Sequence, residues 1–164
     1  MNPSTEQTDE VRIVRRIAVP VDRVFDAFIN PDQLLRWMGP EGYRATRAEV
    51  DARVGGSCDI WVETDGAAAG SFHWEFVELD PPKRLVFSFA FGGPGEEIEE
   101  HRSRMTLDFK EEGPEATELT LVHDRLGAAP PGGHQGVHTG WTQATGKLVR
   151  YLETGKSQNA ETDA

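Results

Sequence analysis

A long amphipathic segment near the C-terminal end constrains the fold of this chain more than any other feature. Its apolar residues recur at helical spacing, namely Val137, Trp141, Ala144, Leu148 and Tyr151 or Leu152. Gly155 follows them as a stop signal. The residues before this segment show mainly the alternation of β-strands. A single long helix can bury its apolar stripe only against a sheet here, so the sequence predicts an α+β domain.

Two short helices are expected directly after the first strand. Residues 11–19 alternate as a strand, and Pro20 ends it. One helical face is then formed by Val21, Val24, Phe25 and Phe28. Asn30 can cap a second helix that has Pro31 at its first position, and Gly39 ends that helix.

Six further strands are expected, in residues 44–50, 57–63, 71–79, 85–91, 101–110 and 118–123. Turns rich in Gly, Pro and Asp separate them, and such short connections favour antiparallel pairing. The clearest strand is 85–91, where Leu85, Phe87, Phe89 and Phe91 share one face. The sequence therefore predicts an antiparallel sheet of about six or seven strands.

The chain is expected to form one domain, residues 11–155, between two loose polar tails at 1–10 and 156–164. A length of 164 residues is ordinary for one domain. The first ten residues are polar and acidic and do not resemble a secretory signal. No apolar run approaches the ~20 residues of a membrane helix, so no membrane span is expected.

Charge and cysteine content narrow the partners and the compartment. The formal net charge is -11, which repels phosphate backbones and anionic lipids, so neither nucleic acid nor a membrane is an expected partner. Cys58 is the only cysteine, which rules out an intramolecular disulfide and a cysteine metal cluster. This favours a reducing compartment, the cytoplasm. The sequence leaves open whether the chain forms a homodimer.

Five segments, taken in order, resemble one known superfamily. They are IAVPVDRVFDAFINPDQLLRWMGP, the Gly55-Gly56 turn, ELDPPKRLVFSF, ATELTLVH and HTGWTQATGKLVRYLE, which lie within residues 11–154. The pattern is similar to the START-like (SRPBCC) superfamily, and within it to the branch named after the ATPase activator of the ninety-kilodalton heat-shock chaperone. The resemblance implies a helix-grip fold, in which a curved antiparallel sheet wraps on the C-terminal helix. It also implies a cavity between the two.

A large stock of aromatic residues could line such a cavity. The residues expected there are Trp37, Trp61, Trp74, Phe76, Phe87, Phe89, Met105, His123 and Trp141. The resemblance places Trp37 and Trp141 near the cavity mouth. Ordinary core packing is the alternative for each of these residues, because buried aromatics are common in any fold.

His123 is the most informative polar residue. It ends an apolar strand face and should point inward. It could be a hydrogen-bonded core histidine, orient a ligand together with Ser103 or Thr142, or act as an acid or base. His134 and His138 are four residues apart but lack the Glu of a zinc-protease motif, so no metal or cofactor is expected. No nucleophile motif or phosphate loop is present, and no catalytic residue is assigned.

Two glycines interrupt the expected final helix. Gly140 and Gly146 each cost about 1 kcal/mol relative to Ala in a helix interior. They indicate either a close approach or spare volume at these points, or they are merely tolerated.

Binding of a small, mostly apolar molecule in the internal cavity is the leading functional hypothesis. The molecule would be a lipid, an aromatic compound or a polyketide-like compound. Two alternatives stay open. One is a cavity-based enzyme of cyclase, aromatase or hydrolase type. The other is a protein-interaction module related to the stress response or to chaperones.

Overall fold

The computed structural model describes residues 10–93, 102–126, 133–157 and 159. Its elements are β1 (Val11–Ile17), α1 (Val21–Ile29), α2 (Pro31–Trp37), β2 (Tyr43–Val50), β3 (Ser57–Thr64), β4 (Ala67–Asp80), β5 (Arg84–Gly92), β6 (Ser103–Gly113), β7 (Ala116–Asp124) and α3 (Gly133–Thr154). The strands form one sheet in the order β1-β7-β6-β5-β4-β3-β2, with every neighbouring pair antiparallel. This confirms the predicted α+β helix-grip fold.

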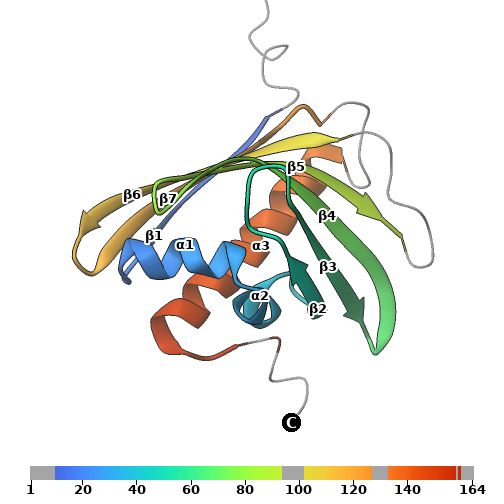
Figure 1. Ribbon diagram of the computed structural model, residues 1–164. Coiled ribbons are helices and arrows are strands. Elements are labelled where there is room, and N and C mark those ends of the chain that lie inside the picture. The colour runs from blue at the N-terminus through green and yellow to red at the C-terminus, as the bar shows by residue number, and fades with distance from the viewer. Residues whose placement is uncertain (1–9, 94–101, 127–132, 158, 160–164) are drawn as a thin grey trace, which may run out of the picture.

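The helices all lie on the concave side of the sheet. The sheet curves over α3, and α1 and α2 lie beside that helix under the same arch (Figure 1). The backbone of α3 lies nearest to β1 and α2. Side chains therefore span the distance between α3 and the central strands. Of the described helices, none is long and apolar enough to cross a bilayer.

Local sequence signals account for the two short helices. In α2 the Asn30 side chain accepts a hydrogen bond from the Asp32 backbone N–H at 3.0 Å, and Pro31 occupies the first helical position. In α1 the apolar face predicted from spacing is buried through Val24 and Phe28. The Asn30 cap of α2 and the apolar face of α1 explain why both helices lie at the predicted positions.

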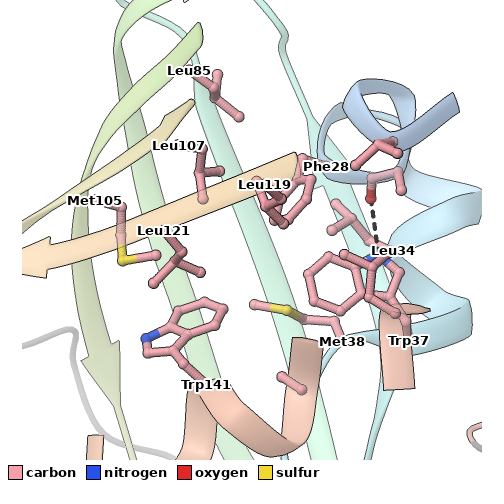
Figure 2. Packing of buried hydrophobic residues seen from close by; sticks show 14 of the residues in the cluster. Phe28, Leu34, Trp37, Met38, Leu85, Met105, Leu107, Leu119, Leu121 and Trp141 are labelled. Atoms are coloured by element: carbon pink, nitrogen blue, oxygen red, sulfur yellow. Dashed lines mark hydrogen bonds between the residues drawn. The ribbon is translucent and has the colours of Figure 1, made fainter. Parts of the chain in front are cut away.

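The core lies between the concave sheet face and the helices. Figure 2 shows Trp141, Met105, Leu121 and Met38 converging from α3, β6, β7 and the end of α2. At the α1–α2 end, Trp37 is fully buried and its Nε1–H donates to the Ala27 carbonyl at 2.9 Å. That hydrogen bond joins the two short helices through the core.

Some element boundaries differ from the prediction. The strand β4 begins at Ala67, four residues before the predicted start, because a bulge at Ala69, next to Gly70, lets the Ala-rich stretch pair with β3. Gly70 has φ +128°, and an added Cβ would lie 2.7 Å from the Phe91 ring. The helix α3 begins at Gly133, before the first apolar residue of its stripe. His101, the predicted start of the sixth strand, lies outside the described residues, and β6 begins at Ser103.

The end of the chain is partly anchored. Residues 1–9 and 160–164 of the predicted tails lie outside the described residues. Ser157 and Asn159 are buried, although the sequence predicts a loose tail from residue 156. Ser157 Oγ donates to the Arg36 carbonyl at 2.5 Å, and Asn159 Nδ2 donates to the carbonyls of Leu35 and Met38 at 3.0 and 3.1 Å. Both side chains therefore bind carbonyls at the C-terminal end of α2.

Candidate functional site

Every predicted lining residue except Trp61 lies on the concave side of the sheet or on a helix that faces it. These residues are Trp37 on α2, Trp74 and Phe76 on β4, Phe87 and Phe89 on β5, Met105 on β6, His123 on β7 and Trp141 on α3. The structure thus brings residues from six elements to one side of the sheet.

Trp61 lies on the opposite, outer face of the sheet. It alternates along β3 with Ile60 and Val62, which are buried in the core. The Arg47 guanidinium lies 4.6 Å from the centre of its ring, a cation–π contact at a half-buried position. The alternation in residues 57–63 already indicates that Trp61 and Ile60 point to opposite faces.

One part of the concave side is fully packed. Trp37, Trp74, Phe87 and Met105 have no exposed surface, and Phe76 is 2% exposed. Trp74 stacks on Phe87, with ring centres 4.1 Å apart and planes 13° apart. These side chains form core.

A second part of the concave side is less enclosed. Phe72, Phe89 and Phe91 are half-buried, although they lie on the inner face of β4 and β5. The ring centre of Phe72 lies 5.5 Å from that of Phe89 and 5.4 Å from that of Phe91. The ring centre of Phe89 lies 5.0 Å from that of His123 and 5.9 Å from that of Trp141. We call Phe72, Phe89, Phe91, His123 and Trp141 the inner aromatic cluster. Phe72 and Phe91 are not among the predicted lining residues, although the alternation in residues 85–91 already places Phe91 on this face.

A directed chain of hydrogen bonds crosses this cluster. Trp141 Nε1–H donates to His123 Nδ1 at 3.0 Å. His123 Nε2 lies 2.6 Å from Ser103 Oγ, and that hydroxyl donates to the Phe89 carbonyl at 3.3 Å. Because Nδ1 accepts a hydrogen bond, the proton of neutral His123 lies on Nε2 and is donated to Ser103.

This arrangement limits what His123 can do chemically. Burial lowers the pKa of His123 to about 4, so the ring is neutral at pH 7. A base that activates Ser103 would need an unprotonated Nε2, but Trp141 fixes the opposite tautomer. The hydrogen-bonded Trp141, His123 and Ser103 side chains therefore act as a fixed polar group within an aromatic surface. Ser103 Oγ keeps a lone pair with which it can accept a hydrogen bond.

Two other buried groups belong to the scaffold. Lys147 Nζ donates to the carbonyls of Gly39, Pro40 and Tyr43 at 3.0, 3.3 and 2.9 Å, which ties α3 to the α2–β2 connection. Burial lowers the pKa of Lys147 to about 8, against the opposing effect of Glu41. Burial, with Asp59 as a lesser cause, raises the pKa of the Cys58 thiol far above its usual range, which makes this thiol unreactive.

The remaining candidates from the sequence lie apart from the cluster. The Thr142 hydroxyl lies 3.5 Å from Nδ1 of the exposed His138 rather than near His123. The side chain of His134 lies outside the described part of the chain. No group of three or more His, Cys, Asp or Glu within that part could hold a metal ion.

The helix glycines do not mark a close approach. A Cβ at Gly140 would meet only the Pro40 ring, at 3.9 Å, and one at Gly146 would meet only the Arg15 guanidinium, at 3.5 Å. Both distances are ordinary van der Waals contacts. The glycines are tolerated there, and Gly140 faces Pro40 rather than the aromatic cluster.

The family comparison covers most of the domain. The family model described as Activator of Hsp90 ATPase homolog 1-like protein matches residues 18–153. No curated protein shows a significant match to the chain.

Solved structures of similar proteins share the fold. Protein CV1439 from Chromobacterium violaceum is 26% identical with a TM-score of 0.71, over 86% of this chain and 95% of that chain. The AHSA1 protein SPO3351 from Silicibacter pomeroyi is 21% identical with a TM-score of 0.75, over 88% and 97% of the two chains. DynU16, a protein of the dynemicin biosynthetic locus, is 28% identical with a TM-score of 0.68, over 91% of this chain and 49% of that chain.

Proposed function

The chain belongs to the family of Activator of Hsp90 ATPase homolog 1-like proteins, and we propose that it binds a small, mostly apolar molecule between its sheet and α3. The fold is the SRPBCC fold, which commonly binds hydrophobic ligands. The ligand would be a lipid, an aromatic compound or a polyketide-like compound. We place this activity in the cytoplasm.

The inner aromatic cluster is the observation that carries the proposal. Phe72, Phe89 and Phe91 stay half-buried on the face that forms the core elsewhere in the sheet. Rings that remain partly exposed on a concave face offer apolar area that a ligand can cover, worth about 25 cal/mol per Å². Ser103 and His123 lie directly beside these rings and supply a fixed polar group for orientation.

The likeness to DynU16 favours a biosynthetic compound as the ligand. DynU16 comes from the dynemicin biosynthetic locus, and this chain spans about half of its length. An aromatic or polyketide-like compound also suits a surface made of tilted and edge-on rings, because aromatic pairs gain from such geometry.

No observation favours the two alternative functions over ligand binding. The tautomer of His123 opposes a Ser103 nucleophile, which weakens the enzyme hypothesis at this site. A protein-interaction module would need a contiguous apolar patch. The large exposed hydrophobic residues of the described chain are Val14, Tyr43, Val54 and Val77, which belong to different strands or loops.

Native mass spectrometry and a tryptophan fluorescence titration test the proposal. Freshly purified protein is expected to carry a co-purifying compound of low mass. Titration with lipids, aromatics and polyketide-like compounds should change the fluorescence of Trp141, so the Trp141→Phe variant should lose most of the signal. Trp61→Phe is the matched control, because Trp61 lies on the outer face. A panel with no binder in either assay would refute the proposal.

A further inference from the structure

A buried hydrogen-bond donor beside the aromatic cluster has no acceptor. The Trp74 indole nitrogen is shielded from solvent and has no hydrogen-bond partner in the described structure. Two other buried indoles differ from it. Trp37 Nε1 donates to the Ala27 carbonyl, and Trp141 Nε1 donates to His123. Native proteins rarely leave a buried donor unsatisfied, so this N–H requires an explanation.

Trp74 borders the inner aromatic cluster on two sides. Phe72 precedes it by two residues on the same face of β4, and Phe89 is its partner across the β4–β5 pair. Phe89 in turn pairs with Ser103 on β6. Trp74 and the Ser103–His123 pair therefore lie on either side of Phe89 in the sheet, on the strands β4, β6 and β7 of the same face.

We propose that Trp74 Nε1 donates a hydrogen bond to a carbonyl-type oxygen of an uncharged, flat apolar ligand held by the inner aromatic cluster. This inference rests on the proposed ligand-binding function. A carbonyl oxygen satisfies the N–H without bringing a further donor that would need its own partner. A ligand hydroxyl elsewhere on the same molecule can donate to Ser103 Oγ, which keeps a free lone pair.

The charges around the site favour an uncharged ligand. The His123 ring is neutral, because its Nδ1 accepts a hydrogen bond from Trp141 Nε1–H and so carries no proton. Its Nε2–H donates to Ser103 Oγ. Arg15 is held by the Thr145 hydroxyl at 3.1 Å and the Thr142 carbonyl at 2.6 Å. Lys147 is held by three carbonyls. A carboxylate on the ligand would therefore lose its water without gaining either of these two cations, Arg15 and Lys147, as a free partner.

The packing around Trp74 sets a condition for binding. Its indole nitrogen is shielded from water, and its ring stacks on Phe87. A ligand oxygen can reach the N–H only if neighbouring side chains shift. Phe72 and Phe89 border Trp74 and are partly exposed, so they are the side chains that would have to shift.

A matched pair of probes tests the donor. 1-Tetralone and tetralin have nearly the same shape, but only the ketone carries an acceptor. Isothermal titration of the wild-type protein is expected to give at least tenfold tighter binding of 1-tetralone. The Trp74→Phe variant should bind both probes with similar affinity. The Trp61→Phe variant should keep the preference, because Trp61 lies on the outer face.

The indole N–H signals of 15N-labelled wild-type protein give a direct readout that does not depend on a variant that folds. The Trp74 signal should move downfield with 1-tetralone and not with tetralin. Equal affinities for the two probes, or a ketone preference without a shift of the Trp74 signal, would overturn the donor role and leave the ligand-binding function intact. If neither probe bound, while other compounds of the panel did, the ligand class inferred here would be wrong. If no compound bound, both proposals would fall.

Discussion

His123 makes the stability of the protein depend on pH at the scale of a single residue. In the unfolded chain its pKa is close to 6.5, and in the folded protein burial lowers it to about 4. As pH falls from 6.5 towards 4, the unfolded state takes up a proton that the folded state does not bind. The free energy of unfolding therefore falls by about 3 kcal/mol between pH 6.5 and pH 4 because of His123 alone.

Urea unfolding of wild type and His123→Gln between pH 7 and pH 4 measures this effect. Glutamine offers an acceptor and a donor but does not titrate, so other titrating groups cancel in the comparison. The variant should be less stable than wild type at pH 7, and the difference should shrink as pH falls. A constant difference would show that the pKa of His123 is the same in the folded and the unfolded state.

Single residues show where sequence reasoning about the site succeeds and where it fails. His123 is expected to point inward because it ends an alternating apolar strand face, and it is 2% exposed. The sequence offers its partner Ser103 only as one of two candidates, beside Thr142, because residues that are 20 apart give no local signal of contact. Trp61 is expected inside because of its residue type, although the alternation around it indicates the outer face.

At the scale of secondary-structure elements, α3 can be stabilised at its glycines. An alanine Cβ fits at Gly140 and at Gly146 without a steric clash. Gly140→Ala and Gly146→Ala should each raise the free energy of unfolding by up to about 1 kcal/mol, because alanine is the better helix former. Thermal and urea unfolding measure the change. Destabilisation by either variant would mean that the local packing is tighter than described.

Gly70→Ala is the matched contrast in a strand. Gly70 has φ +128°, and a Cβ there would lie 2.4 Å from the Gly92 carbonyl oxygen. The variant should lose at least about 1 kcal/mol of stability in the same assays, since alanine fits neither the backbone angle nor the space.

Lys147 fastens α3 to the α2–β2 connection. Lys147→Met keeps most of the length and apolar volume of the side chain but leaves the carbonyls of Gly39, Pro40 and Tyr43 without this donor. The expected loss is about 2 kcal/mol in the free energy of unfolding, because the Gly39 carbonyl is buried. Unchanged stability by urea unfolding would mean that water replaces the ammonium group without penalty.

The element boundaries depart from the sequence prediction for identifiable physical reasons. Residues 67–70, Ala-Ala-Ala-Gly, have low strand propensity, and only pairing with β3 across a bulge recruits them into β4. Residues 133–136 lack an apolar stripe, yet α3 extends through them. Elements with strong periodicity, such as β5 and α2, start within one residue of the predicted position.

At the scale of the whole molecule, the two faces of the sheet carry different chemistry. The outer face holds charged networks, such as His73 with Asp59 at 2.5 Å and Glu75 at 3.2 Å. The helices lie on the concave side (Figure 1). The core and the inner aromatic cluster lie between them and the sheet. The net charge of -11 adds a general repulsion of anions to this division. Both features favour uncharged ligands for the concave side.

This division predicts discrimination between two probes of similar size. At pH 7, 2-acetonaphthone should raise the stability against urea by about 1.4 kcal/mol at ten times its dissociation constant. The same concentration of 2-naphthoate should have a much smaller effect, because its carboxylate would be buried while Arg15 and Lys147, among the described residues, stay bound to their own partners. Repeating the experiment in 1 M NaCl separates repulsion by the net charge from desolvation of the carboxylate. Salt screens the long-range repulsion but does not change the cost of removing water from the carboxylate. Equal stabilisation by both probes would show that the site contains an available cation.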